Sequence, residues 1–395
     1  MRGAATRWAM FAGVVAVPIS VAVWSTLFGN AAATNTAITT AAVAAGDVTV
    51  SSSGELNRAL AASRGGTISL LPGRYTQVIV NGLKPARQVV ITSANPALRA
   101  EIGSLLIRNS ANIVVDGLAF AALDSGRRFA LDVEGSNNVA LRNLAFQNTV
   151  KDAGANGDLA PVSAIFLRNS KQLSVTGSRF ADYWNGVSHL AVTGLVVADN
   201  VFWSLRTDGV RGGGSSDVTI TRNIFYNFHP APGDHPDAVQ FWIRPENGPS
   251  SNISVTRNLI VGGGEATIQG IFMRSLDGRI FSNVTISGNL LVGTLFNGIA
   301  LSSGRNVSIE NNFVLQAPPA KSWIRVQDVA SLGLSGNMAT TFLLDGRAQP
   351  GVSGFRVFDG SARVRQQAIA DWRARNNDWL AAGSEQGRLA DAALK

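Results

Sequence analysis

The chain of 395 residues contains no cysteine, only three histidines and three tyrosines, and 15% charged residues. Without cysteine it can form neither disulfides nor Cys-based zinc sites, so its stability must come from a packed core. There is no HExxH motif and no Gly-x-Ser-x-Gly elbow, and the glycine triplets at 212–214 and 262–264 lack the spacing of a phosphate loop. These absences argue against zinc and nucleotide cofactors.

The first 45 residues have the pattern of an export segment. Arg2 and Arg7 precede an uncharged stretch from Trp8 to Phe28, and small residues follow to about Gly46. We expect a cleaved signal and a secreted or periplasmic protein. The uncharged stretch is long enough to span a bilayer, so contact with a membrane through an uncleaved anchor is the alternative.

One short sequence motif recurs nine times between residues 110 and 341. Each copy alternates apolar and polar residues, reaches a lone Asn or a small substitute, and ends in two or three apolar residues. We align the copies on Gly117, Asn143, Ser178, Asn200, Asn223, Asn258, Asn289, Asn312 and Asn337. A period mostly in the low twenties, with alternation at period two and no helical periodicity, is typical of a stacked solenoid of strands.

The repeat predicts an all-β fold, a single-stranded parallel β-helix over residues 46–345. Asn at the same bend of each coil can form a ladder of hydrogen bonds and tolerates a left-handed backbone. This structural role explains the regular spacing of the Asn residues without any catalytic function. Residues 346–395 form a separate C-terminal segment in this division.

The pattern resembles the right-handed parallel β-helix proteins of the pectate-lyase-like superfamily, over about residues 47–345. In that family a short helix plugs the first coil, and Ser52 with Glu55 has the spacing of a helix capping box. A solenoid needs atypical end pieces to cover its terminal coils. We therefore expect an N-terminal capping helix and a helical cover formed by residues 361–394.

A second row of polar residues opens another strand of each coil. Its six members are Ser163, Asn185, Asp208, Asp237, Gln269 and Asn297. Neighbouring parallel strands lie about 4.8 Å apart, so Asp208 and Asp237 should be adjacent. Such a pair can raise one carboxyl pKa or bind Ca²⁺, or each Asp can simply cap a turn. We therefore expect no required cofactor, with Ca²⁺ bound by Asp208 and Asp237 as the alternative.

Long coils and a histidine-rich loop occur beside this pair. Insertions in solenoids tend to emerge on the binding face, and the inserted segments here are 148–161, 228–237, 244–250 and 262–267. His229 and His235 lie in the second of these segments, whereas His189 is more distant and is interpreted as structural. The run Asp234-His235-Pro236-Asp237 resembles the Asp-Pro-His-Asp motif of alginate C5-epimerases, in a different order.

Cationic and aromatic residues on the same coils complete the predicted site. Arg168, Arg211, Arg244 and Arg274 occupy positions of one parity, which places them on one face of the sheet. Guanidinium groups there can bind carboxylates through paired hydrogen bonds, and Trp242 and Tyr183 can stack on sugar rings. The predicted catalytic residues are His235, Asp237, Asp208 and Arg211. The predicted substrate-binding residues are Arg244, Arg274, Arg168, Trp242, His229 and Tyr183.

These residues favour an exported lyase that cleaves an acidic, uronate-containing polysaccharide by β-elimination. Net charge is +8 and pI about 10.5, which suits a polyanion, while the sequence has no helix-turn-helix or zinc-finger spacing that would indicate nucleic acid. His235 is the expected base, and Arg211 is the alternative that the resemblance to β-helix lyases implies. A C5-epimerase, a glycosidase using both carboxylates and a non-catalytic polysaccharide-binding surface protein are the other interpretations. The polysaccharide and the oligomeric state are left open.

Overall fold

The computed structural model describes residues 46–121, 127–149, 162–244, 248–263, 268–276, 278–317, 321–349 and 354–395. The predicted export segment lies outside these ranges. Among the residues that the structure describes, no helix has both the length and the apolar character needed to cross a membrane.

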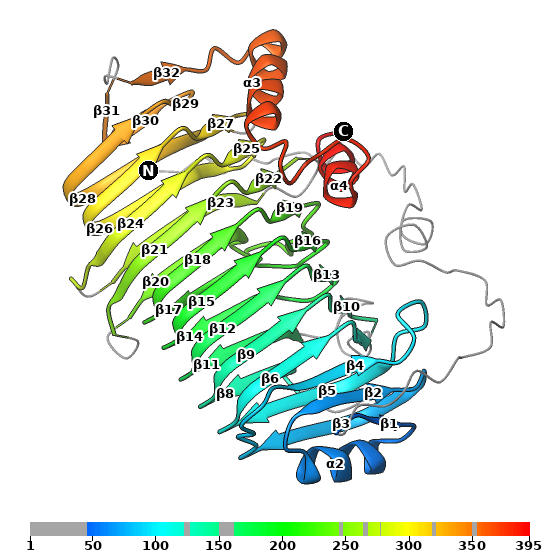
Figure 1. Ribbon diagram of the computed structural model, residues 1–395. Helices are drawn as coiled ribbons and strands as arrows, with labels where there is room; N and C mark the ends of the chain where they lie inside the picture. The colour runs from blue at the N-terminus through cyan, green and yellow to red at the C-terminus, as the bar shows by residue number, and fades with distance from the viewer. Residues whose placement is uncertain are drawn as a thin grey trace, which may run out of the picture. The chain divides into compact units, whose positions relative to one another are not determined.

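The strands form three parallel stacks that follow one another around each coil, as in a parallel β-helix (Figure 1). Sheet 1 contains β1 (Val48–Val50), β2 (Gly66–Leu70), β4 (Val89–Ser93), β6 (Ala111–Asp116), β9 (Asn137–Arg142), β12 (Lys171–Thr176), β15 (Thr193–Ala198), β18 (Ser216–Thr221), β21 (Ser250–Thr256), β24 (Phe281–Ser287) and the second halves of β26 (Phe296–Glu310) and β28 (Ser322–Ser335).

Sheet 2 carries the polar row that the sequence predicted. It contains β3 (Arg74–Asn81), β5 (Glu101–Arg108), β8 (Phe129–Glu134), β11 (Ser163–Arg168), β14 (Val187–Leu190), β17 (Val210–Gly213), β20 (Asp237–Ile243), β23 (Gln269–Ser275), the first halves of β26 and β28, and β30 (Phe342–Leu344). Within the described residues, β30 also pairs antiparallel with β31 (Arg347–Ala348).

Sheet 3 consists of strands of three residues. They are β7 (Ala119–Ala121), β10 (Ala145–Gln147), β13 (Arg179–Ala181), β16 (Val201–Trp203), β19 (Ile224–Tyr226), β22 (Leu259–Val261), β25 (Leu290–Val292), β27 (Phe313–Leu315), β29 (Asn337–Ala339) and β32 (Phe355–Val357). Because successive coils are in register, each side chain lies above its counterpart in the preceding coil. The predicted all-β parallel β-helix is confirmed.

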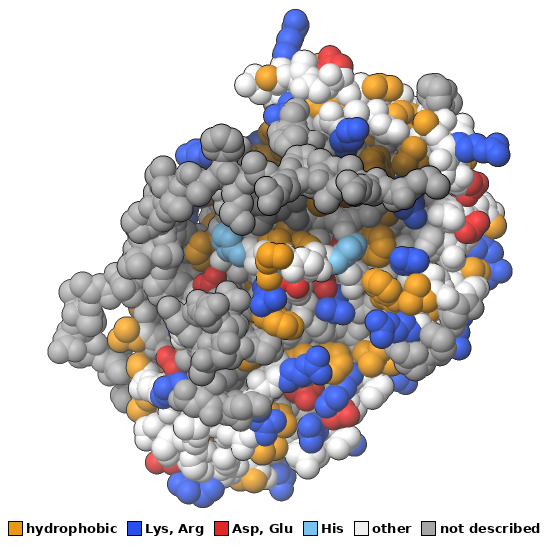
Figure 2. Space-filling model, turned by 180° about the vertical axis from the view of Figure 1, so that it is seen from behind, with side chains coloured by type: hydrophobic (Ala, Val, Ile, Leu, Met, Phe, Trp, Pro, Cys, Tyr) orange, Lys and Arg blue, Asp and Glu red, His pale blue; other side chains and the backbone are white. Residues whose placement is uncertain are grey.

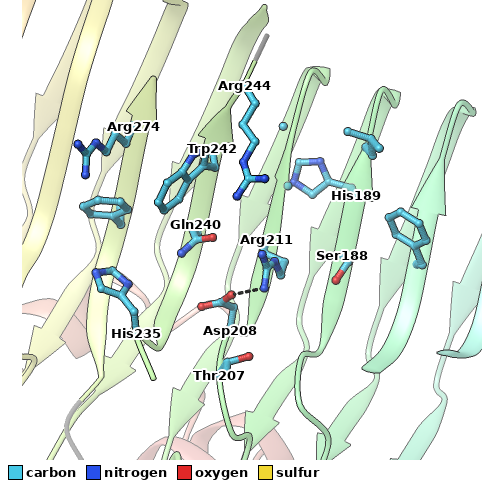
Figure 3. A pocket seen from close by; sticks show the side chains of 15 residues that line it. Ser188, His189, Thr207, Asp208, Arg211, His235, Gln240, Trp242, Arg244 and Arg274 are labelled. Carbon is cyan, nitrogen blue, oxygen red and sulfur yellow. Dashed lines mark ion pairs between the residues drawn. The ribbon is translucent and has the colours of Figure 1, made fainter. Parts of the chain in front are cut away.

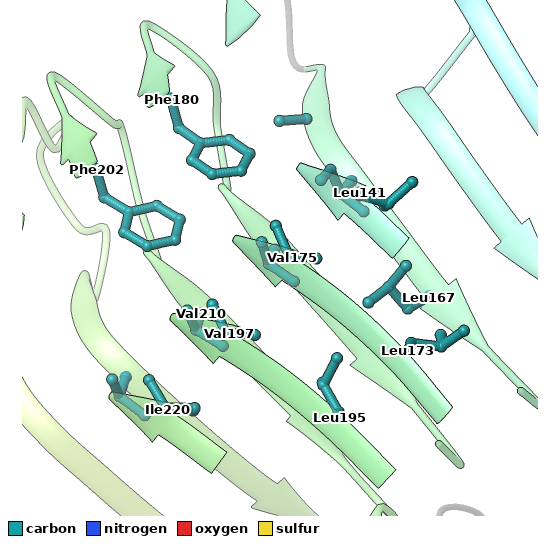
Figure 4. Packing of buried hydrophobic residues seen from close by; sticks show 14 of the residues in the cluster. Leu141, Leu167, Leu173, Val175, Phe180, Leu195, Val197, Phe202, Val210 and Ile220 are labelled. Atoms are coloured by element: carbon teal, nitrogen blue, oxygen red, sulfur yellow. The ribbon is translucent and has the colours of Figure 1, made fainter. Parts of the chain in front are cut away.

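Residues of the same type stack on one another in the interior of the coil. Phe120, Phe146, Phe180, Phe202 and Phe225 form a column on sheet 3, with neighbouring ring centroids 4.5–4.9 Å apart and nearly parallel rings. Valine, leucine and isoleucine from the inward positions of sheets 1 and 2 pack against this column (Figure 4). The repeat therefore buries a continuous core without disulfides.

The predicted asparagine ladder is present at the bend between sheets 1 and 3. From Asn200 to Asn337, each side-chain amide donates to the Oδ1 of the next asparagine at 2.9–3.0 Å. Each amide also donates to a main-chain carbonyl of the preceding coil, for example Asn258 to Ile220 at 3.0 Å. These asparagines are almost completely buried, so the ladder satisfies polar groups inside the turn.

Two details of the predicted ladder are wrong. Strand register aligns Ala119, Ala145 and Arg179, so the ladder position in the first two coils is Leu118 and Leu144, one residue after the Gly117 and Asn143 that the repeat suggested. The left-handed backbone also falls one residue before the ladder, at Gly117, Asn143, Gly177, Asp199, Arg222, Arg257, Gly288, Asn311 and Gly336. The ladder side chain serves hydrogen bonding, and its neighbour makes the bend.

Replacing Asn258 with Ala is expected to lower the free energy of unfolding by about 2–5 kcal/mol, because each buried partner left without a hydrogen bond costs about 1–3 kcal/mol. Asn258 Oδ1 accepts from both the main-chain and the side-chain nitrogen of Asn223 at 3.0 Å. Denaturant unfolding measures the loss. Asn283→Gly is the matched control, because Asn283 belongs to an exposed outer ladder and has a φ of 56°, which glycine accepts. Equal losses in the two variants would contradict this role.

The predicted N-terminal capping helix is present, and the predicted C-terminal helices form but lie along sheet 3 and do not only cover the last coil. Helix α2 (Ser53–Ala62) begins at the Ser52 cap and buries Leu56 and Leu60 against the first coil. Near the other end, α3 (Ala362–Arg375) and α4 (Glu385–Ala393) run back along the flank of sheet 3 (Figure 1). The buried Trp372 indole donates to the Gly288 carbonyl, and Gln386 of α4 donates to the carbonyl of Asp199.

Candidate active site

The predicted polar row lies at the start of the sheet 2 strands. Asn185 donates to Ser163 Oγ at 2.9 Å, and the main-chain nitrogen of Asp237 donates to Asp208 Oδ1 at 3.0 Å. Asn297 donates to the side-chain oxygen of Gln269. The coil stacking therefore brings Asp208 and Asp237 together on adjacent coils, as the sequence predicted.

The two carboxylates face different partners. The Asp208 side chain, 3% exposed, forms an ion pair with Arg211 at 3.0 Å and lines a groove. The Asp237 side chain is fully buried, and its Oδ2 receives hydrogen bonds from His235 Nδ1 at 3.0 Å and from Gln240 at 2.7 Å. Figure 3 shows His235, Asp208 and Arg211 converging on the groove. One carboxylate thus reaches the groove directly, and the other acts through histidine.

The pKa values of Asp208, Asp237 and His235 are all raised, the two carboxyls mainly by burial. Burial raises the pKa of Asp208 to about 7, and the nearby charge of Asp237 adds to this shift. The pKa of Asp237 is also raised, again mainly by burial. The hydrogen bond to Asp237 raises the pKa of His235 above its usual value. A carboxyl and an imidazole whose pKa values are both raised by their surroundings are suited to exchange protons with a substrate.

Hydrogen bonds orient the His235 ring. Trp323 donates to Asn297 Oδ1, Asn297 donates to Gln269, and the Gln269 amide nitrogen contacts His235 Nε2. In this arrangement Nε2 accepts and Nδ1 donates to Asp237, which defines the neutral tautomer. A neutral imidazole whose Nε2 carries the lone pair is the form required of a base.

The groove has a volume of about 610 Å³ and lies on the outer surface of sheet 2. Arg211, Arg244 and Arg274 line it, and the Arg244 guanidinium lies 5.7 Å from the centre of the Trp242 ring. Figure 2 shows basic side chains gathered around acidic ones on the face seen from behind. Cations beside a flat aromatic surface suit a ligand that carries both carboxylates and sugar rings.

The structure places three predicted substrate-binding residues elsewhere. Tyr183 is 1% exposed and packs edge-on against Phe146 in the core, so it cannot stack on a sugar. His229 is exposed but contacts Asn227 and does not line the described groove. Arg168 is bound by Asp132 and Glu134 at 3.1 and 3.0 Å, outside the described groove lining. These three assignments are corrected accordingly.

His189 has a structural role, as predicted, but it also borders the groove. Its Nδ1 lies 2.9 Å from Ser215 Oγ, and burial lowers its pKa to about 4. Its ring occupies the space beside Gly212, where a Cβ would lie 2.4 Å from Nδ1. Gly212 therefore lets a neutral imidazole form part of the groove wall.

Sequence reasoning missed several lining residues. Gln240 is the counterpart of Arg211 on the next strand, and Phe272 is the counterpart of Gln240. Both could have been predicted from the sequence, because Gln240 and Phe272 follow Asp237 and Gln269 by three residues, just as Arg211 follows Asp208. Thr207, which donates to Asn185 Oδ1 at 2.7 Å, lies in a turn and carries no such signal. Of the inserted segments, 228–237 is described and brings His235 to the groove, whereas 150–161, 245–247 and 264–267 lie outside the described residues.

The acidic pair does not fit a Ca²⁺ site. Arg211 is already bound to Asp208, and Asp237 Oδ2 is occupied by His235 and Gln240. Among the described residues, no group of three or more His, Cys, Asp or Glu side chains could hold a metal ion. Ca²⁺ prefers six to eight oxygen ligands, which this arrangement does not offer.

The coils and the groove on one of their sheets define a right-handed parallel β-helix protein. Residues 163–314 match the family described as "Right handed beta helix region". No curated protein sequence matches the chain.

Solved structures with a similar fold include proteins of three kinds. An alginate lyase from Paenibacillus sp. str. FPU-7 is 12% identical, with a TM-score of 0.51 over 79% of this chain and 99% of that one. PfbA, a surface adhesin of Streptococcus pneumoniae, is 13% identical, with a TM-score of 0.52 over 76% and 80%. A Family 28 exopolygalacturonase from Yersinia enterocolitica is 10% identical, with a TM-score of 0.50 over 77% and 73%. At these identities the likeness shows the fold alone.

Proposed function

We propose that the protein is an exported polysaccharide lyase that cleaves an acidic, uronate-containing polysaccharide by β-elimination. The observation that carries the proposal is the pairing of His235 with the fully buried Asp237, at the edge of a groove lined by arginines. The alginate lyase of similar fold is consistent with this activity. Secretion or a periplasmic location is part of the proposal.

Each group has a place in the reaction. Arg211 or Arg244 binds the carboxylate of the sugar that reacts and stabilises the charge that develops on it. His235 Nε2 takes the proton from C5 once the substrate displaces the Gln269 amide that contacts it, and Asp237 stabilises the imidazolium that forms. The electrons of the C5–H bond form the C4–C5 double bond, the C4–O bond breaks, and the leaving oxygen takes a proton.

Asp208 is the best placed donor of that last proton. Its pKa of about 7 means that a large fraction is protonated near neutral pH, and it lines the groove. A tyrosine donor is not available there, since Tyr75 and Tyr183 are buried and Tyr226 lies on sheet 3. Asp208 and His235 thus carry the acid and base roles on neighbouring coils.

The buried position of Asp237 favours a lyase over a glycosidase. A glycosidase needs two carboxyl groups that both reach the sugar, and Asp237 has no exposed surface. An epimerase would use the same base and return the proton to the opposite face of the sugar. The similar fold of a surface adhesin makes binding without catalysis the contrasting outcome.

Incubating the purified protein with alginate, pectate, glucuronan and bacterial acidic exopolysaccharides tests the proposal. We expect the ultraviolet absorbance of the new C4–C5 double bond with one of these polymers. We expect no loss of rate when a chelator is added, because arginine and not Ca²⁺ binds the carboxylate. Reducing ends without the absorbance would indicate a hydrolase, inverted C5 centres in the NMR spectrum an epimerase, and binding without products an adhesin.

A further inference from the structure

The arginines on the outer surface of sheet 2 are paired with carboxylates toward the N-terminal end of the solenoid and not toward its C-terminal end. On the N-terminal side of Asp208, Arg108 and Arg168 are both bound to Asp132 and Glu134, with distances of 3.0–3.9 Å. Opposite charges on neighbouring strands neutralise each other there. Arg108 and Arg168 are therefore already paired and offer little attraction to a second anion, and the charge of Arg127 also acts on Asp132.

On the C-terminal side, three arginines have no ion-pair partner among the residues that the structure describes. Arg244 and Arg274 are exposed, and Arg325 is half-buried. Within the described part of the chain, none of the three forms an ion pair, and Arg325 contacts only the side-chain oxygen of Gln327, at 3.4 Å. Figure 3 shows Arg274 on the far side of Trp242 from Ser188, and Arg244 between them, above Arg211.

The groove continues past His235 toward Arg325. A second hollow of about 180 Å³ shares His235, Phe272 and Arg274 with the first and adds Asn297, Ser302 and Arg325. Two cations on this extension, Arg274 of β23 and Arg325 of β28, have no ion pair within the described ranges and can bind anionic groups of one extended ligand. A polymer lying along the coils would therefore meet charge on several coils beyond the catalytic pair.

The opposite end of the groove is lined by uncharged residues. Phe166 borders it and stacks on Phe129, with ring centroids 4.8 Å apart, and Ser188, Leu190 and Gly213 also line it. The Arg168 guanidinium lies 5.2 Å from the centre of the Phe166 ring, but its charge is already paired with Asp132 and Glu134. A sugar ring can stack on an aromatic face without carrying charge. This end therefore selects by shape and apolar contact.

We propose that the groove binds its substrate asymmetrically. Sugar units over β23 and β28 carry carboxylates that bind Arg274 and Arg325, whereas the unit over β11 and β14 stacks on Phe166 and needs no charge. The substrate class is thus an acidic polysaccharide whose uronate requirement is confined to one side of the site. This inference rests on the proposed function and specifies its selectivity.

Arg274→Gln and Arg325→Gln test this asymmetry, with Arg108→Gln and Arg305→Gln as controls. Arg108 is paired with Asp132 and Glu134, and Arg305 is exposed on sheet 1. A charge-assisted hydrogen bond contributes about 1.5–3 kcal/mol, so each of the first two variants should raise KM for a uronate polymer by about tenfold or more and leave kcat nearly unchanged. The controls should change KM by less than about twofold. Thermal melting verifies that all four variants are folded.

A second readout uses an oligosaccharide of the cleaved polymer and the same oligosaccharide with its carboxyl groups reduced to alcohols. The wild type should bind the reduced form at least about tenfold more weakly. Arg274→Gln combined with Arg325→Gln should remove most of that difference, and Arg108→Gln should retain it. If the wild type acts on the polymer but the double variant keeps the full difference, the asymmetry is wrong and the lyase assignment stands. If the wild type neither cleaves nor binds any uronate polymer, the proposed function fails and this inference with it.

Discussion

His235→Ala is expected to lower the rate of uronate cleavage by about 10²–10⁴-fold, the contribution typical of a positioned base. The side chain is 50% exposed, so its removal sacrifices little packing. Asp237 loses its partner but can take up a proton, because burial already raises its pKa. Cleavage rates and a thermal melt of the same sample measure the two effects. The variant should melt close to the wild type and release almost no unsaturated product.

His229→Ala is the matched control for this experiment. It removes an imidazole from the same loop, yet His229 does not line the described groove. Its rate should stay within about twofold of the wild type. Full activity in His235→Ala, or equal losses in the two variants, would show that another group removes the proton.

Asp208→Asn is expected to abolish most cleavage and, at the same time, to stabilise the folded protein above neutral pH. Asn retains the oxygen that accepts from the Asp237 main chain, but it has no carboxyl proton to give to the leaving oxygen. Asparagine is already accepted in this row at Asn185 and Asn297, which indicates that the substitution fits. A loss of activity together with a gain of stability is characteristic of a functional residue that strains its surroundings.

The direction of the pH effect follows from the raised pKa. A group with a folded-state pKa of about 7 and an ordinary value of 3.8 binds its proton more tightly in the folded state. Its stabilising contribution is complete below pH 3.8 and is lost as the pH rises through 7. Near pH 8 the wild type therefore holds a buried charge that the variant lacks. We expect Asp208→Asn to be more stable there by a few kcal/mol.

Thermal melts of both proteins between pH 4 and pH 9 measure this difference. The melting temperatures should converge at acid pH and separate as the pH rises. A variant that is less stable than the wild type at pH 8 would show that the ion pair with Arg211 outweighs the burial of Asp208. A variant that still cleaves at the wild-type rate would remove Asp208 from the acid role.

Repetition made most of the scaffold predictable. Because each coil repeats the one before, the positions of Asn200 through Asn337 and the polar row from Ser163 to Asn297 could be read directly from spacing. The first two coils were misaligned by one residue, since leucine occupies their ladder position and Gly117 and Asn143 imitate the signal beside it. The amino-acid type alone does not distinguish the residue with the left-handed backbone from the next residue, whose side chain forms the hydrogen bonds between coils.

Site residues were harder to predict outside regular strands, because there the path of the chain decides which way a side chain points. Parity placed Arg211, Arg244 and Arg274 on the outer face, and the structure agrees. Tyr183 precedes a strand, and the turn that carries it points its ring into the core. The loop around His229 is held by the ion pair of Asp234 with Arg206, a contact between residues 28 apart that no local pattern reveals.

The tail of the chain affects how the solenoid comes apart. In a simple stack each coil contacts only its neighbours, so fraying can begin at an open end and progress one rung at a time. Here the tail joins rungs far apart: Trp372 binds at Gly288, and Glu385 and Gln386 bind at Arg179 and Asp199. Unfolding of the last coils would therefore also break the contacts that the C-terminal helices make with the middle coils. Unravelling should become all-or-none, and the groove between the two anchor points should be the last part to open.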